Sequence, residues 1–119
     1  MLDIIRGYSK FNTTITEAFN QVQLNEDEER IPLRKSTIEL IRKYVVLSTE
    51  YVKAAAAKNK GDMKYYLKRL SETAELFTPE IVKEIPPKVK SEMMARNKTL
   101  QEITKQFLKD WSNGNYRYG

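Results

Sequence analysis

The sequence predicts an all-α protein, a single-domain bundle of five or six helices that spans residues 1–119. Apolar residues recur at steps of three and four along most of the chain, which is the spacing of one helix face. No stretch alternates polar and apolar residues between turn signals, and four glycines and four prolines in 119 residues leave few turns for a multi-strand fold. The length suits one domain built around one core.

The first segment is predicted to form one helix or a broken pair of helices. Its stripe of mainly apolar residues runs through Met1, Ile5, Tyr8, Asn12, Ile15, Phe19 and Val22. Thr14 followed by Glu17 is a capping-box pattern, which would start a separate helix there. Asn12 is then either a polar residue that sets the register of a helix–helix interface or part of the break. An acidic loop over residues 25–31 is expected to follow, with Glu26, Asp27, Glu28 and Glu29 exposed to solvent.

The second helix is predicted to be one long central helix over about residues 36–60. It would begin with Pro32 in its first turn or with Ser36 as its cap. Two adjacent stripes form a face wide enough for several neighbours: Ile38, Ile41, Val45, Ser48, Val52 and Ala55, and beside them Leu40, Tyr44, Leu47, Tyr51 and Ala54. Gly61 is expected to end this helix, and Asp62 is expected to cap a third helix.

Prolines delimit the fourth element. The run Thr78-Pro79-Glu80 combines a cap, a first-position proline and a first-turn acid, so a short helix is predicted there. This helix must end before Pro86, because a proline pushes the residue before it out of the helical region.

The C-terminal part predicts two more helices. Pro87 would open a fifth helix that ends at Arg96, and the capping box formed by Thr99 and Glu102 would start a last one. A short flexible tail is expected over residues 113–119. Two helices joined by a short turn also occur in DNA-binding motifs, but this turn has no glycine, so an ordinary packed hairpin is favoured.

No catalytic residue, metal ligand set or cofactor is predicted, and we expect the chain not to be an enzyme. Cysteine and histidine are both absent, which excludes thiolate nucleophiles, imidazole acid–base chemistry and the usual zinc sites. The four glycines are scattered rather than gathered in a phosphate-binding loop. No tyrosine or lysine stands beside a recognisable base that would activate it.

The sequence also predicts a protein without a membrane segment. No apolar run approaches the roughly 18 residues that a membrane-spanning helix needs. The start of the chain carries Asp3 and lacks the basic region and apolar core of a signal peptide. We therefore expect a cytoplasmic location.

Positive charge is concentrated in one short segment. Residues 31–70 hold ten basic and three acidic side chains, whereas residues 1–30 carry a net charge of −3. Six of these cations, opposed only by Asp62 within their segment, form what we call the basic cluster: Lys53, Lys58, Lys60, Lys64, Lys68 and Arg69. Close cations release counterions from an anionic polymer. The basic cluster therefore predicts contact with the backbone of a single strand or hybrid nucleic acid, without sequence readout.

Other residues extend this prediction and leave alternatives open. One of Tyr65 and Tyr66 is expected to face the core and the other to offer a ring for base stacking, and Tyr65 is assigned to the interface. Arg42 and Lys43 would extend the basic surface along the long helix. The cluster could instead be a solvated helix end, where lysines favour the helix dipole, or a surface for an acidic protein partner.

A second set of residues predicts contact with other protein subunits or self-association. Tryptophan, tyrosine and arginine are favoured anchors of protein interfaces, and the candidates are Trp111, Tyr116, Arg117 and Tyr118. The alternative is that Trp111 belongs to the core and that the tail is frayed. The acidic residues 26–29 could meet the basic cluster of another copy head to tail.

A wholly helical chain of this length, without catalytic residues and with a basic helical face, resembles the small subunits of CRISPR effector complexes. The similarity rests on the predicted Ile38–Lys60 helix and the Lys53–Arg69 segment, about a third of the chain. The resemblance implies a filament-forming protein of antiviral defence that contacts the backbone of the guide-paired or displaced strand and performs no reaction. No motif aligns, so no residue role is carried over.

Overall fold

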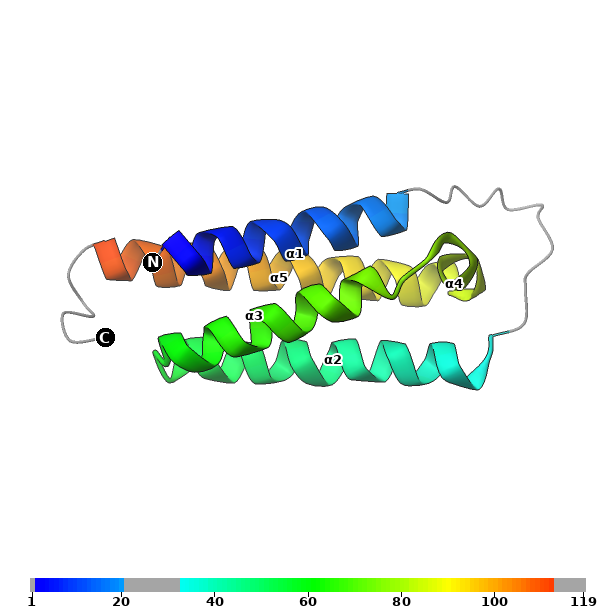
Figure 1. Cartoon of the computed structure of the whole chain (residues 1–119), viewed down its shortest axis with the longest axis horizontal. Coiled ribbons are helices and arrows are strands. Elements are labelled where there is room, and N and C mark those ends of the chain that lie inside the picture. Colours follow the sequence, from blue (N-terminus) through cyan, green and yellow to red (C-terminus); the bar gives the residue numbers. More distant parts are fainter. Residues whose placement is uncertain (1, 21–32, 113–119) are drawn as a thin grey trace.

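The computed structural model describes residues 2–20 and 33–112, which form five α-helices. They are α1 (Leu2–Asn20), α2 (Lys35–Ala56), α3 (Lys60–Glu75), α4 (Pro79–Glu84) and α5 (Pro87–Ser112). Figure 1 shows α1, α2, α3 and α5 lying along one another as an elongated bundle, with the short α4 at one end. The prediction of an all-α bundle is confirmed.

The helices pack in an order that differs from their order in the chain. The contacts of α3 with α1 and with α2 are the most extensive, while α5 packs less closely against the same two helices. In Figure 1, α1 and α3 run in one direction and α2 and α5 run in the other. The starts of α1 and α3 and the ends of α2 and α5 therefore share one end of the bundle.

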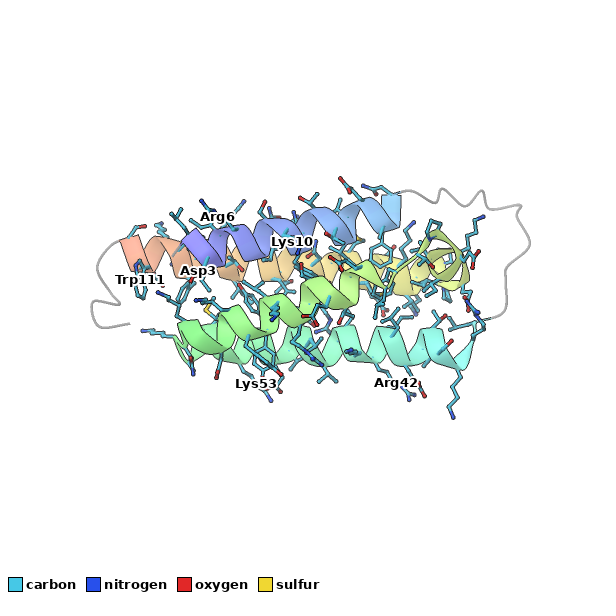
Figure 2. All side chains as sticks on the ribbon, viewed as in Figure 1. Asp3, Arg6, Lys10, Arg42, Lys53 and Trp111 are labelled. Carbon is cyan, nitrogen blue, oxygen red and sulfur yellow. The ribbon has the colours of Figure 1, made fainter. Side chains whose placement is uncertain are left out.

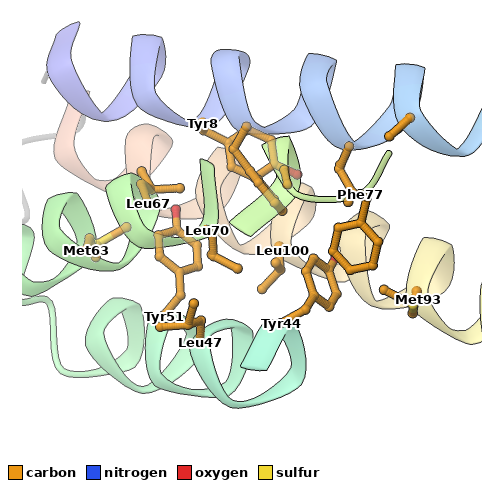
Figure 3. Close-up of a cluster of buried hydrophobic side chains, with 14 of the residues drawn as sticks. Tyr8, Tyr44, Leu47, Tyr51, Met63, Leu67, Leu70, Phe77, Met93 and Leu100 are labelled. Atoms are coloured by element: carbon orange, nitrogen blue, oxygen red, sulfur yellow. The ribbon is translucent and has the colours of Figure 1, made fainter. Parts of the chain in front are cut away.

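The core is a row of aromatic and aliphatic side chains that joins the helices (Figure 3). Tyr44 of α2 lies between two rings, with centroids 6.1 Å from Phe11 of α1 and 6.3 Å from Phe77 after α3. Phe77 in turn lies 5.6 Å from Phe19. Each such buried aromatic removes a large apolar area from water, which makes this row a main source of stability.

Of the two alternatives for the first segment, one helix is confirmed and the broken pair is wrong, because α1 is continuous from Leu2 to Asn20. The Thr14 hydroxyl does not cap a new helix but donates a 2.8 Å hydrogen bond to the Lys10 carbonyl one turn earlier. Asn12 lies in the interface with α5, where its side-chain oxygen accepts a 2.8 Å bond from the Asn97 amide. Of the two roles considered for Asn12, the one in a helix–helix interface is confirmed.

The predicted turn at residues 96–99 is also wrong, because α5 runs unbroken from Pro87 to Ser112. Neither a helix-turn-helix motif nor a helical hairpin exists there. Thr99 donates to the Ala95 carbonyl at 3.2 Å instead of capping a helix. Asn97 is buried at the α1 interface, where its carbonyl also accepts a 3.1 Å bond from the Tyr8 hydroxyl. The polar residues 96–99 locally favour a turn. The contacts with α1 give Asn97 hydrogen-bond partners within a continuous helix instead.

The bounds of α2 and α3 differ from the predicted ones. α2 ends at Ala56 rather than at Gly61, because Lys58 adopts the left-handed conformation with φ 58°. Asn59, not Asp62, then caps α3: its side-chain oxygen accepts a 3.0 Å bond from the Asp62 backbone N–H, and its amide donates to the Asp62 carboxylate at 2.9 Å. The starts predicted at Thr78-Pro79 and at Pro87 are confirmed.

The start of α2 is held by a residue from α4. Arg34 occupies the cap position without a side-chain cap bond, so Ser36 is not the cap, and Pro32 lies outside the described residues. The buried Glu84 carboxylate accepts instead, from the Arg34 backbone N–H at 2.9 Å and from the Thr37 hydroxyl at 3.0 Å. The Arg34 guanidinium donates to the same carboxylate at 2.6 and 3.0 Å. These bonds, that of the guanidinium above all, lower the Glu84 pKa to about 2.

We expect Glu84→Gln to lower the free energy of unfolding at neutral pH by about 2 kcal/mol, because the charge-assisted bonds to Arg34 are lost. Denaturant titration of the two proteins measures this difference. Glu92→Gln, at an exposed position of α5, is the matched control and should leave stability nearly unchanged.

The same pair should show a defined pH dependence. The folded pKa of about 2 lies below the ordinary value of 4.5, so the contribution of Glu84 is complete above about pH 5 and is lost as the pH falls toward 2. The gap in stability between the wild type and Glu84→Gln should therefore narrow as the pH falls from 5. A gap of constant size would contradict this role.

Candidate functional site

The basic cluster begins at the end of the bundle where α2 turns into α3. Lys53 is in the last turn of α2, Lys58 is in the turn, and Lys60 opens α3. The left-handed Lys58 and the Asn59 cap reverse the chain within three residues, which keeps these cations close. The start of α1 and the end of α5 lie at the same end (Figure 1). Lys53, Lys58, Lys60 and Lys64 lie at this end, whereas Lys68 and Arg69 lie more than two turns further along α3, so the six cations do not all gather at one end.

The six cations also point to different sides of the bundle. Lys64 and Lys68 lie on the side of α3 that faces α1. Lys53 projects from the outer side of α2, away from the bundle (Figure 2). Arg69 follows Lys68 by one residue and so points roughly 100° away from it around the helix axis. An anionic polymer that met all six would have to wrap around the end of the bundle.

Lys53, Lys60 and Lys64 each contact a partner within the protein. Lys64 bonds the Asp3 carboxylate of α1 at 2.6 Å, and this bond is the main reason that the pKa of Asp3 lies well below its usual range. Lys53 lies 3.3 Å from Glu50, one turn earlier on α2. The Lys60 ammonium lies over the Trp111 ring, 5.2 Å from its centroid. Because the two ion pairs are exposed to solvent, each holds its lysine only weakly.

The two neighbouring tyrosines of α3 take the two environments that were predicted. Tyr66 packs partly against the core, whereas Tyr65 is 55% exposed. Their rings meet edge to face with centroids 5.1 Å apart. The contact with Tyr66 therefore restrains the Tyr65 ring along one edge. The exposed Tyr65 ring lies one helical turn before Arg69.

Arg42 and Lys43 are exposed on α2 but lie apart from the turn. Arg42 precedes Lys53 by eleven residues, which is close to three helical turns or about 16 Å. Figure 2 shows the side chains of Arg42 and Lys53 on the outer side of α2. Arg42 therefore extends the basic surface along α2 rather than joining the cluster.

Of the predicted partner anchors, only Trp111 can be placed. Its ring is partly buried, lies 6.2 Å from the Phe107 ring and carries Lys60 on its face. This position favours the alternative in which Trp111 is part of the core. Tyr116, Arg117 and Tyr118, the tail at 113–119 and the acidic loop at 25–31 lie outside the described residues.

Sequence reasoning missed the part that α1 contributes to the site. Asp3, Gly7 and Lys10 follow one another at steps of four and three, so they share a flank of α1, and this flank meets α3. The two helices meet closely at Gly7, where a Cβ would make an ordinary 3.5 Å contact with the Leu67 side chain. The helical spacing was visible in the sequence, but the neighbour that it faces was not.

The groups with shifted pKa values point to structure rather than to a reaction. Burial raises the pKa of Tyr8 and Tyr44 and raises that of Tyr51 to about 12. All three are core residues, and Glu84 holds the start of α2. Within the described ranges no group of acidic side chains could hold a metal ion, and no helix is long and apolar enough to cross a membrane.

No protein-family model matches this chain, and searches of the curated proteins and of the solved structures find no significant match.

Proposed function

We propose that this chain is a non-enzymatic, nucleic-acid-associated subunit of a larger assembly, and that its basic end contacts the phosphate backbone of a single strand or hybrid without reading sequence. The observation that carries the proposal is the gathering of Lys53, Lys58, Lys60 and Lys64 at one end of the bundle beside the exposed Tyr65 ring, with Lys68 and Arg69 further along α3. A cytoplasmic assembly of the CRISPR effector type is the setting that the resemblance of the sequence implies.

Charge at the basic end supports binding that depends on salt. Beyond the cluster, Arg6 of α1 and Lys109 in the last turn of α5 lie at the same end. Neutralising several phosphates releases their counterions, and this entropy gain gives an affinity that falls steeply with salt. The exposed ion pairs of Lys53 and Lys64 do not prevent this, because a phosphate can replace a solvated carboxylate at little cost.

Tyr65 supports a preference for unpaired strands. An exposed aromatic ring beside cations offers a surface on which a base can stack, whatever its identity. In a duplex the bases are already stacked, so the ring would gain little there. A base on Tyr65 and phosphates on nearby cations would make a strand-binding surface without sequence specificity.

The first test reverses the charge of three lysines that hold no core contact. Lys53, Lys58 and Lys68 are all exposed, and changing them to glutamate leaves the contacts of Lys60 and Lys64 in place. We expect a fluorescently labelled single strand to bind at least about tenfold more weakly. The slope of log K against log salt should also fall by about 2, the share of three phosphates on a single strand.

The matched control reverses three exposed lysines elsewhere, Lys35, Lys83 and Lys88, and so changes the net charge equally. This control should lose much less affinity. Equal losses in the two triple variants would mean that net charge alone drives binding, and the basic end would then have no special role.

The second test removes the Tyr65 ring. Tyr65→Ala should weaken single-strand binding by about tenfold, within the range of base–aromatic stacking, while Tyr65→Phe should keep most of the affinity. Because the side chain is 55% exposed, thermal unfolding of both variants should stay close to that of the wild type. Equal affinity of Tyr65→Ala and the wild type would exclude stacking at this ring.

A second candidate function is a protein-interaction or oligomerisation module whose basic end docks on an acidic partner. The exposed apolar side chains of Leu2 and Ile5, at 64% and 45%, favour it because they stand in the first turns of α1 at the same end. Light scattering should then show mass that rises with protein concentration in the absence of nucleic acid. A constant monomer mass at high concentration would argue against self-association.

A further inference from the structure

A groove runs between the parallel helices α1 and α3. Its volume is about 350 Å³, at the lower end of the range of roughly 300–1,000 Å³ that small-ligand sites occupy. Gly7 and Leu67 contribute to its wall where the two helices approach closely. A space of this size suits a single small group rather than a large ligand.

Two lysines line the groove from opposite sides. Lys10 comes from α1 and Lys68 from α3, and both side chains are exposed. Figure 2 shows Lys10 on the side of α1 that faces α3. Neither lysine forms an ion pair with any of the residues that the structure describes. The third lysine of the groove, Lys64, is held by Asp3 at 2.6 Å, so it contributes less charge than the other two.

A buried hydroxyl lies in the wall of the same groove. Ser71 is only 6% exposed, and within residues 2–20 and 33–112 its Oγ has no hydrogen-bond partner. A buried polar atom without a partner costs free energy of about 1–3 kcal/mol, so such atoms are rare in folded proteins. Ser71 follows Lys68 by three residues, which places the two side chains on adjacent turns.

We propose that the α1–α3 groove binds one phosphate group, with Lys10 and Lys68 as its charge partners and Ser71 as a hydroxyl donor. Two ammonium groups and one hydroxyl supply donors for the three non-bridging oxygens of a phosphate monoester. The same phosphate would complete the hydrogen bonding of Ser71.

The acidic residues of the groove restrict what it accepts. Glu72 and Glu75 also line it, about one and two turns beyond Lys68 along α3. Their carboxylates repel a second anionic group, so a run of several phosphates is disfavoured there. The groove therefore suits a terminal phosphate, either at the end of a strand or free in solution, rather than a backbone that continues across it.

This site is separate from the strand surface of the proposed function. It shares Lys64 and Lys68 with the basic cluster but needs neither Lys53 nor Tyr65. Phosphate could therefore bind in the groove even if no strand binds at the basic end, and the reverse also holds.

Backbone amide NMR of the full chain tests the proposal with three probes: inorganic phosphate, a dinucleotide with a 5′-phosphate and the same dinucleotide without it. Inorganic phosphate should shift the amides of Gly7, Lys68 and Ser71 more than chloride does at equal ionic strength. Tighter binding of the phosphorylated dinucleotide would identify a strand end as the source, and equal binding would identify free phosphate. The dinucleotide without the terminal phosphate should leave these amides unmoved.

Variants distinguish phosphate binding in the groove from attraction of phosphate by general surface charge. Ser71→Ala and Lys68→Gln should each weaken phosphate binding by about five- to tenfold, and Glu72→Gln should strengthen it. Lys35→Gln, at an exposed position outside the groove, should leave it unchanged. The proposal is overturned if no probe shifts the groove amides, or if Ser71→Ala binds as well as the wild type while its spectrum shows a folded protein.

Discussion

The Glu84 carboxylate is the constraint on which the arrangement of the bundle depends. α2 has no side-chain cap of its own, and without Glu84 the backbone N–H of its cap residue Arg34 would lose its acceptor. Glu84 supplies the acceptor from a helix of only six residues and fixes it to α2 through Arg34 and Thr37. With the start of α2 fixed at the α4 end, its C-terminal end lies at the far end of the bundle. The turn that carries Lys58 is therefore held at one end by a contact made at the other.

Buried polar contacts between α1 and α5 serve a related purpose. The Tyr8 hydroxyl, the Asn12 side chain and Asn97 meet in one interface, and each satisfies part of another's hydrogen bonding. Such pairs hold two helices in one register, because a shift along the axis would leave buried polar atoms without partners. The register brings Asp3 of α1 and Trp111 of α5 to the lysines at the start of α3.

The cations of the basic end thus differ in whether they already contact a partner within the protein. Lys60 and Lys64 are tied to Trp111 and Asp3, whereas Lys68 and Arg69 have no ion pair among the described residues. The proposed strand surface and the proposed phosphate groove draw on this difference, because a cation without a partner can meet an anion without first losing a contact. The two sites meet at Lys68, which lines the groove and belongs to the basic cluster.

The sequence by itself determined the helical class, the starts at Thr78-Pro79 and Pro87, and the gathering of lysines around residues 53–69. These features follow from propensities, caps and charges that act within a few residues. Only the tertiary structure decided whether Thr14 and Thr99 cap a helix or bond back along it, because both choices are locally available and contacts such as Asn12–Asn97 select one. The tertiary structure also decided which lysines contact a partner within the protein. Asp3 can pair with Lys64 because α1 and α3 lie parallel. This parallel arrangement is set by the burial of whole helix faces rather than by any local signal.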